Sequence, residues 1–305
     1  MKPKLVIILG PTAVGKTDTV LDLAAHFGAE IISADSQQVY RHMDIGTAKP
    51  TREQREAIPH HLIDIVEPDE DFNAAMFRNL AIETASKLAD RGKRIIVCGG
   101  TGLYIKALTK GLFAGPGRNP QIRQALESEI EQHGVGPLYQ RLEEVDSTSA
   151  RRIHLHDWQR ITRALEVYQA TGRTISEWQN QHGFNDLLFT VLKIGLDRQR
   201  AELYERIDRR CDHMIKAGLV DEVKGLVAKG YGLDLKPMQS VGYRHAGLFL
   251  RARMSMDNAL DLMKRDTRRL AKRQLTWFRS DREIHWFDPE RERSNIEDTA
   301  RRFFA

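Results

Sequence analysis

The segment GPTAVGKT near the N-terminus matches the phosphate-binding pattern G-x-x-x-x-G-K-[ST] at every specified position. Glycines in such a loop let successive backbone N–H groups point at a phosphate, and the following helix adds the positive end of its dipole. We expect Lys16 to reach the terminal phosphate and the Thr17 hydroxyl to hold Mg²⁺. The predicted phosphate-binding residues are Gly10, Pro11, Thr12, Ala13, Val14, Gly15, Lys16 and Thr17.

The sequence on either side gives this loop the context that the pattern requires. The continuous apolar run over residues 5–9 predicts a strand buried on both faces, and it stops at Gly10. A helical pattern with Val20, Leu23 and Ala24 follows the loop and ends at Gly28. The alternative is a chance glycine turn ahead of a helix, but the order of strand, loop and helix favours a phosphate site.

Two further apolar runs predict strands with distinctive ends. Residues 30–34 lead to Asp35, and residues 94–98 lead to the turn GGTG, which opens a helix over residues 104–108. Carboxyl ends of strands face the ligand crevice of an open α/β sheet, so we expect Asp35 to point towards the phosphate loop. The alternative for Asp35 is a cap for the next short helix. The strand that ends at Cys98 offers no terminal Asp, which argues against a standard ATPase or GTPase.

Composition excludes several classes of protein. The 305 residues are 41% apolar and 29% charged, which excludes intrinsic disorder and collagen-like repeats. The two cysteines, Cys98 and Cys211, lie far apart, so neither a disulfide framework nor a zinc site is indicated. No apolar run approaches the roughly 18 residues of a membrane span. We therefore expect a cytoplasmic protein with no membrane attachment, and a monomer, since the sequence contains no obvious coiled coil.

Helical patterning replaces the strand-like runs in the middle of the chain. Asn119 followed by Pro predicts a helix that runs to about Gly134, and apolar spacing over residues 158–168 predicts another that ends at Gly172. Ser176 and Gln179 have the spacing of a capping box. We expect an α/β fold: a P-loop NTPase-like core with a central parallel sheet over residues 1–114 and 186–305, and an all-helical insertion over 115–185.

Basic residues concentrate near the C-terminus. The whole chain has 47 Lys and Arg against 42 Asp and Glu, a formal charge of +5. Residues 262–282 alone hold eight basic and two acidic side chains. Their spacing predicts one helix with a two-row basic face suited to a phosphate backbone, although a solvated face is the usual alternative. The rows are Lys264, Arg268 and Lys272, and Arg265, Arg269 and Arg273; the predicted inward stripe is Leu260, Met263, Thr267, Leu270 and Phe278.

Nine motifs together resemble the tRNA dimethylallyltransferases, the isopentenyl (IPP) transferase family that modifies the adenine beside the tRNA anticodon. The motifs are GPTAVGKT (10–17), DSQQVY (35–40), DIGTAKP (44–50), PHHLID (59–64), GGTGLYIKAL (99–108), RALEVYQATG (163–172), RIDRRCDHMI (206–215), VGYR (241–244) and AKRQLTWFR (271–279). The resemblance spans nearly the whole chain, and the chain is similar to the bacterial members of the family. Family members commonly carry Arg or Met where this chain has Gln37, which leaves Asp35 untouched.

The resemblance implies transfer of a dimethylallyl group from dimethylallyl diphosphate to N6 of the adenine at tRNA position 37. A phosphate loop without a strand-end carboxylate suits this reaction, because a carbon of the diphosphate substrate is attacked rather than a phosphorus. Asp35 matches the family's general base and Arg210 its diphosphate-contacting arginine, beside Lys16, Thr17 and Mg²⁺. For Arg210 the alternative is a solvated helix face. The adenine must leave the stacked anticodon loop, so we expect a channel that it enters opposite the diphosphate.

The same resemblance implies a set of tRNA contacts, with the helical insertion as a tRNA-gripping lobe. For Ile161 the alternative is core packing. The implied contacts are Asp35, Ser36, Gln37, Gln38, Thr101, Arg123, Gln159, Arg160, Ile161, Thr162, Arg163, Gln239, Ser240, Val241, Gly242, Tyr243 and Arg244, to which the basic C-terminal helix adds Lys272, Arg273 and Arg279.

Three other functions are compatible with a phosphate loop. A small-molecule kinase predicts a metal-holding carboxylate and an Arg-rich lid, neither of which is identifiable. An adenylate isopentenyltransferase, which acts on free AMP or ADP, leaves the insertion and the basic helix without a task. An RNA-binding module without catalysis does not explain Asp35 at a strand's carboxyl end.

Overall fold

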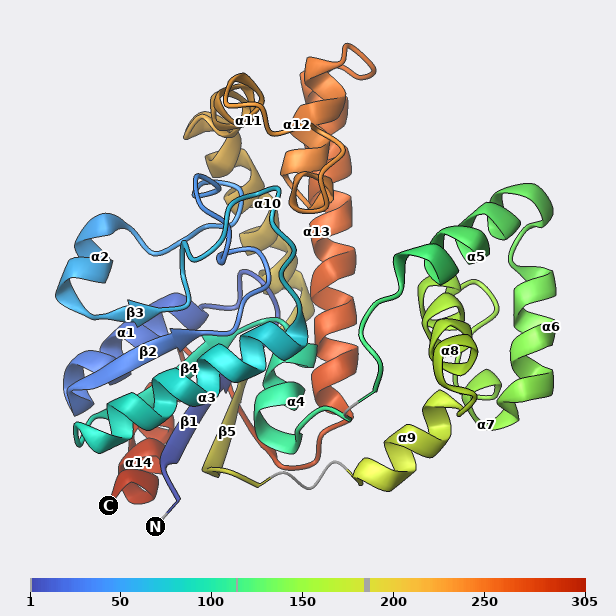
Figure 1. Ribbon diagram of the computed structural model, residues 1–305. Coiled ribbons are helices and arrows are strands. Elements are labelled where there is room, and N and C mark those ends of the chain that lie inside the picture. Colours follow the sequence, from blue (N-terminus) through green and yellow to red (C-terminus); the bar gives the residue numbers. More distant parts are fainter. Residues whose placement is uncertain (1, 114, 184–186) are drawn as a thin grey trace. The chain divides into compact units, whose positions relative to one another are not determined.

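The computed structural model describes residues 2–113, 115–183 and 187–305. The chain forms two compact units, one of Met1–Thr109 with Leu187–Ala305 and one of Lys110–Asp186 (Figure 1). The predicted start of the insertion at residue 115 lies just inside the second unit, while the boundary positions 114, 185 and 186 lie outside the described residues. No helix in the described ranges is long and apolar enough to cross a membrane.

The first unit is built on a parallel sheet with the strand order β3-β2-β4-β1-β5-β6. β1 lies between β4 and β5, and its apolar residues are buried because helices cover both faces of the sheet. This confirms the predicted α/β class with a central parallel sheet. The strands are β1 (Lys4–Leu9), β2 (Ala29–Ser33), β3 (His60–His61), β4 (Arg94–Gly99), β5 (Thr190–Leu196) and β6 (Ile284–Phe287).

The helices of this unit cover the sheet and extend beyond its carboxyl edge. The crossovers through α1 and α3 run in opposite directions along the sheet, so right-handed connections place these helices on opposite faces (Figure 1). α14 packs beside α1, where the Phe304 and Phe27 rings lie 5.4 Å apart. The helices are α1 (Lys16–Phe27), α2 (Arg52–Ala57), α3 (Ala74–Asp90), α4 (Gly102–Lys110), α10 (Arg200–Lys216), α11 (Leu219–Ala228), η1 (Pro237–Gln239), α12 (Tyr243–Leu250), α13 (Met256–Arg279) and α14 (Arg293–Phe304).

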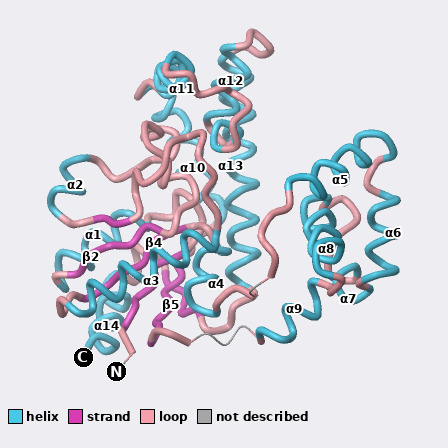
Figure 2. The backbone as a smooth tube through the Cα atoms, in the orientation of Figure 1, coloured by secondary structure: helices cyan, strands magenta, loops and turns pink. Residues whose placement is uncertain are grey.

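Register brings three loops to one edge of the sheet. Leu9 of β1 pairs with Gly99 of β4, and Ser33 of β2 pairs with Cys98. The loops that follow these strands therefore start side by side, and Figure 2 shows loops gathered between the strands and α10.

β5 and α13 differ from the sequence prediction. β5 was not predicted because Lys193 and Gly195 interrupt its apolar run; the Lys193 side chain is nevertheless buried and pairs with Asp281 at 2.6 Å and Glu283 at 2.8 Å. In α13 the predicted stripe is only partly confirmed. Met263, Thr267 and Phe278 are buried, whereas Leu260 and Leu270 are partly exposed and Ala259 and Ala271 complete the buried face.

The second unit is all-helical and has its own core. Its helices are α5 (Pro120–His133), α6 (Gly136–Val145), α7 (Ser147–Ala150), α8 (Trp158–Thr171) and α9 (Ile175–His182). The predicted Asn119 cap is confirmed, as are the helix ends at Gly134 and Gly172. The predicted capping box is wrong: Thr174 and Glu177 form it, because the helix starts at Ile175 and places Ser176 inside its first turn. The core residues are Leu126, Leu138, Leu142, Ala150, Ile161, Ala164 and Leu165.

Candidate functional site

The phosphate loop connects β1 to α1 in a conformation that depends on its glycines. Gly10 has φ +148° and Gly15 has φ +113°, backbone angles that residues with a side chain rarely adopt. A Cβ at Gly10 would also lie 2.6 Å from the Leu196 carbonyl oxygen of β5. The neighbouring strand therefore leaves no room for a side chain where the loop begins.

Lys16 lies folded over its own loop. Its Nζ donates to the carbonyl oxygens of Gly10 at 3.1 Å and Pro11 at 2.7 Å. Burial lowers the pKa of Lys16 to about 8, and the nearby positive charge of Arg210 acts in the same direction. An ammonium held by two neutral carbonyl groups, with its charge poorly solvated, is well placed to turn towards an anion bound in the loop.

Two arginines that the sequence did not single out hold the loop from outside. Arg206 Nε donates to the Ala13 carbonyl oxygen at 2.9 Å, and Arg198 Nε donates to that of Val14 at 2.9 Å. Arg206 begins the motif RIDRRCDHMI, but no local pattern indicates either contact, because both join positions far apart in the chain. These bonds occupy the carbonyl groups of Ala13 and Val14 and tie the phosphate loop to α10 and to the residues just before it.

Asp35 follows β2 and stabilises the turn behind it. Its Oδ1 accepts from the backbone N–H groups of Gln37 at 2.8 Å and Gln38 at 3.4 Å. The same turn is fixed from β4, because Thr101 Oγ1 accepts from the Ser36 N–H at 3.0 Å. The capping role considered for Asp35 is thus present, in a turn rather than a helix, and it uses one carboxylate oxygen.

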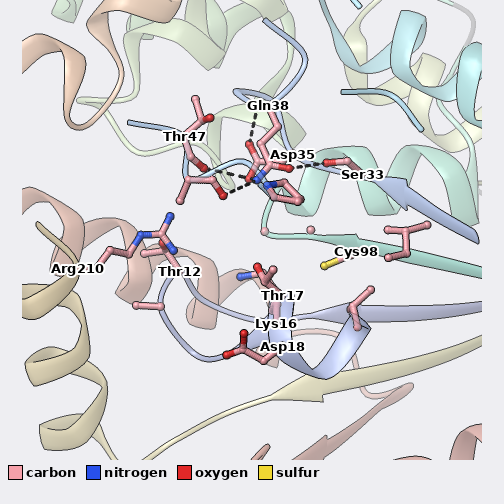
Figure 3. Close-up of a pocket in the computed structure, with 18 of the residues that line it drawn as sticks. Thr12, Lys16, Thr17, Asp18, Ser33, Asp35, Gln38, Thr47, Cys98 and Arg210 are labelled. Atoms are coloured by element: carbon pink, nitrogen blue, oxygen red, sulfur yellow. Dashed lines mark hydrogen bonds between the residues drawn. The ribbon is translucent and has the colours of Figure 1, made fainter. Parts of the chain in front are cut away.

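The loops enclose two adjoining cavities. The first, of about 620 Å³, contains the phosphate loop with Lys16 and Thr17. The second, of about 640 Å³, lies between the turn after Asp35 and α13. Figure 3 shows the first cavity, with Asp35, Lys16 and Arg210 drawn around it. Both cavities are lined by Thr12, Asp35, Thr47, Gly100, Arg210 and Gln274.

Arg210 belongs to this shared wall, so its side chain is not on a solvated helix face. Burial lowers the pKa of its guanidinium, and the negative charge of Asp35 opposes that shift. The group therefore stays cationic while being poorly hydrated, which strengthens its attraction for an anion.

The second cavity collects most of the predicted tRNA contacts of the first unit. Eight of them line it together with Asp35: Ser36, Gln37, Thr101, Gln239, Ser240, Val241, Arg244 and Arg273. Gln38 lines the first cavity instead. Gly242 and Tyr243 are buried, and the Tyr243 hydroxyl donates to Glu222 at 2.6 Å, so this side chain supports the wall rather than facing a ligand. Lys272 and Arg279 are exposed on α13, where Arg279 pairs with Asp197 at 2.7 Å.

The basic face of α13 is more neutral than its own sequence suggests. Lys264 pairs with Asp212 at 2.6 Å, and Arg268 pairs with Asp208 at 2.6 Å; both acids come from α10. The row that contains Lys264 and Arg268 is therefore largely an interhelical ion-pair row, a correction to the predicted two-row phosphate footprint. The adjacent row, with Arg269 and Arg273, lines the second cavity.

The predicted contacts in the insertion divide into exposed and buried side chains. Gln159 and Arg160 are exposed on α8. Ile161 and Thr162 are fully buried, so core packing describes them and the expectation that these two side chains face tRNA is corrected. The predicted contacts Arg123 and Arg163 both bond the fully buried carboxylate of Glu166, at 3.1 Å and 3.0 Å.

The first cavity also contains residues that bear on metal and redox chemistry. Thr17, at the start of α1, is exposed there. No group of three His, Cys, Asp or Glu side chains suited to a metal occurs among the residues that the structure describes. At the end of β4, burial raises the pKa of Cys98 to about 11, so its thiol is neutral.

Gln274 is a further residue of the site that sequence reasoning missed. It lines both cavities, and its Oε1 accepts from the Thr12 N–H at 2.9 Å. It lies inside the motif AKRQLTWFR, but a polar residue in a basic helix gives no separate signal.

Known proteins match this chain over most of its length. The sequence model described as IPP transferase matches residues 38–281. A tRNA dimethylallyltransferase of Syntrophobacter fumaroxidans is 52% identical over 284 residues, which cover 93% of this chain and 83% of the relative. The structure of a Bacillus halodurans tRNA isopentenylpyrophosphate transferase is similar with a TM-score of 0.73 and 39% identity, covering 99% of this chain and 97% of that one. A eukaryotic dimethylallyltransferase acting on tRNA gives a TM-score of 0.78 at 27% identity, covering 98% and 77%.

Proposed function

This chain belongs to the IPP transferase family and transfers a dimethylallyl group to an adenine of tRNA, and we propose that its two adjoining cavities hold the two substrates of that reaction. The observation that carries the proposal is the shared wall. Asp35 and Arg210 lie where the cavities meet, between a phosphate loop on one side and an arginine-lined space on the other.

In the first cavity, the diphosphate of dimethylallyl diphosphate occupies the phosphate loop. The loop N–H groups, the Lys16 ammonium and the Arg210 guanidinium then surround the leaving group, whose negative charge grows as the allylic C–O bond breaks. Their charge is fixed and poorly hydrated before the reaction begins, so little reorganisation is required.

The donor set fits a magnesium ion bound mainly by its substrate. Mg²⁺ in such sites takes one or two protein oxygens and completes its octahedron with water and phosphate oxygens. The exposed Thr17 hydroxyl would supply the protein oxygen, and the ion would neutralise charge on the diphosphate.

In the second cavity, the adenine at tRNA position 37 presents N6 to the shared wall after leaving the anticodon stack. The amine is a weak nucleophile because its lone pair is delocalised into the ring. The N6 lone pair forms a bond to C1 of the allyl group, the C1–O bond breaks, and the diphosphate departs with the electron pair. Asp35 accepts the proton that N6 loses.

The insertion and the charged surface hold the rest of the tRNA. Gln159 and Arg160 are exposed on one helix of the insertion, and the paired Arg123 and Arg163 add positive charge to the same unit. These residues support a role in gripping the anticodon stem. We propose that the protein acts as a monomer, in the cytoplasm with its tRNA substrate.

Label transfer tests the function. The protein is incubated with Mg²⁺, labelled dimethylallyl diphosphate and either tRNA, AMP or ADP. We expect label at N6 of adenine 37 in tRNA and none in AMP or ADP. Label in the free nucleotides alone would instead identify an adenylate isopentenyltransferase, and label at another nucleotide would overturn the assignment of position 37.

A further inference from the structure

The side chain of Gln274 connects the two catalytic loops that border the cavities. Its Oε1 accepts from the Thr12 N–H at 2.9 Å, and its Nε2 donates to the Gly100 carbonyl oxygen at 3.0 Å. Thr12 follows β1 and Gly100 follows β4, which are neighbouring strands. One carboxamide thus joins the phosphate loop to the GGTG turn.

This connection lies in the wall between the substrate cavities. Thr12, Gly100 and Gln274 are three of the six residues that line both cavities. A Cβ at Gly100 would clash with Gln274 Nε2, so glycine at this position lets the amide approach the turn. Gln274 itself lies on α13, directly after Arg273 of the second cavity.

Only a carboxamide of this length can satisfy both main-chain groups. Gln offers one acceptor and one donor from the same planar group, whereas a carboxylate only accepts and a thioether does neither strongly. The Thr12 N–H, bonded to Gln274, is also withdrawn from the set of loop amides that face a phosphate. The bond therefore fixes which way the start of the phosphate loop faces, rather than adding a phosphate contact.

We propose that Gln274 is a positioning residue that sets the distance between the phosphate loop and the GGTG turn, and so aligns the allylic carbon with adenine N6. This inference rests on the proposed arrangement of the two substrates. α13 then has two roles. Its arginines line the second cavity, and Gln274 holds the two loops in register. Misalignment of reacting groups by about 1 Å costs on the order of 10²-fold in rate.

The first test is Gln274→Met, which keeps the side-chain length and removes both bonds. We expect kcat for tRNA prenylation to fall by about 10- to 100-fold, while the Kd values for inorganic diphosphate and for tRNA stay within about threefold. Thr276→Ala on the same helix is the matched control. Thr276 is exposed, and its hydroxyl donates to the Lys272 carbonyl oxygen within α13, so the kcat of this variant should equal that of the wild type.

Gln274→Glu separates positioning from a general structural role. An ionised Glu can accept from Thr12 N–H but repels the Gly100 carbonyl oxygen, whereas a protonated Glu reproduces the acceptor and the donor of Gln. The ratio of its kcat to that of the wild type should therefore rise as the pH is lowered from about 8 to about 5.5. A residue that merely fills space would give a flat ratio.

The outcomes are distinguishable from failure of the proposed function. Wild-type protein that transfers no label defeats the function itself. If the wild type is active, two results overturn the positioning role. In one, the kcat of Gln274→Met lies within threefold of the wild-type value; in the other, the variant's defect lies entirely in the Kd values. Loss of a cooperative melting transition in both variants also overturns it, because Gln274 would then be required for the fold.

Discussion

Asp35→Asn is the perturbation that most directly tests the chemistry at the shared wall. The substitution keeps Oδ1, which accepts from the Gln37 N–H at 2.8 Å and the Gln38 N–H at 3.4 Å, so the turn after β2 is retained. What disappears is the negative charge and the ability to accept a proton. The variant therefore isolates base catalysis from the structural role of Asp35 in its turn.

The size of the effect follows from these contacts. A positioned general base contributes about 10²- to 10⁴-fold, which corresponds to about 2.7–5.4 kcal/mol of transition-state stabilisation. The Asp35 charge also opposes the positive charge of Arg210, so its removal leaves the diphosphate side more cationic. We therefore expect kcat to fall by at least 100-fold while diphosphate binding is unchanged or slightly tighter.

Single-turnover transfer of labelled dimethylallyl group to tRNA measures the first quantity, and equilibrium binding of inorganic diphosphate measures the second. Asp18→Asn controls for loss of charge, because it removes a carboxylate from the far side of the first cavity; it should change transfer by no more than about fivefold. An Asp35→Asn rate within tenfold of the wild type would refute Asp35 as the base. Equal losses in the two variants would show that charge alone matters.

Three further predictions follow from the charged groups. Burial lowers the pKa of Lys16 to about 8, so its protonated form is lost above that pH. In calorimetric titrations, the affinity of the wild type for inorganic diphosphate should therefore fall above about pH 8 relative to that of Lys16→Met. Glu166→Ala should destabilise the insertion by about 1–3 kcal/mol, since it removes the buried acceptor shared by Arg123, Arg163 and the Asn119 N–H, and hydrogen exchange of α5 and α8 would report this loss. Arg273→Ala should weaken tRNA binding and reduce its salt dependence by about one counterion, whereas Arg268→Ala should leave the salt dependence almost unchanged because Asp208 already neutralises Arg268.

The catalytic core could be predicted because its signals are local. Continuous apolar runs give β1, β2 and β4, and the glycines at 10 and 15 belong to a pattern whose spacing is set by phosphate geometry. Parallel strands then place Asp35 at the correct edge without further information. Asn119 and Gly172 mark helix ends in the insertion for the same reason, since capping depends on adjacent residues.

The remaining features depend on contacts between distant segments. α10 supplies the acids that neutralise one row of α13, and no count within α13 can include them. Ile161 shows the same limit in the insertion: helical spacing fits both a core residue and a contact, and only the packed helices decide between them. Gln274 bonds residues more than a hundred positions away, so its role exists only in the folded chain.

The end of β4 explains how a phosphate loop can serve carbon chemistry. In phosphoryl transfer, a strand-end Asp usually helps hold the metal at the phosphorus under attack. Here the strand ends in Cys98 and Gly99, and burial raises the pKa of the thiol to about 11, so this position adds no negative charge to the cavity. In the proposed arrangement, Lys16 and Arg210 therefore face the diphosphate with no carboxylate at the end of β4, which favours the departure of an anion. Asp35 lies instead on the wall shared with the second cavity, where the proposed nucleophile loses its proton. We infer that a carboxylate on the shared wall, rather than at the end of β4, suits this loop to allyl transfer.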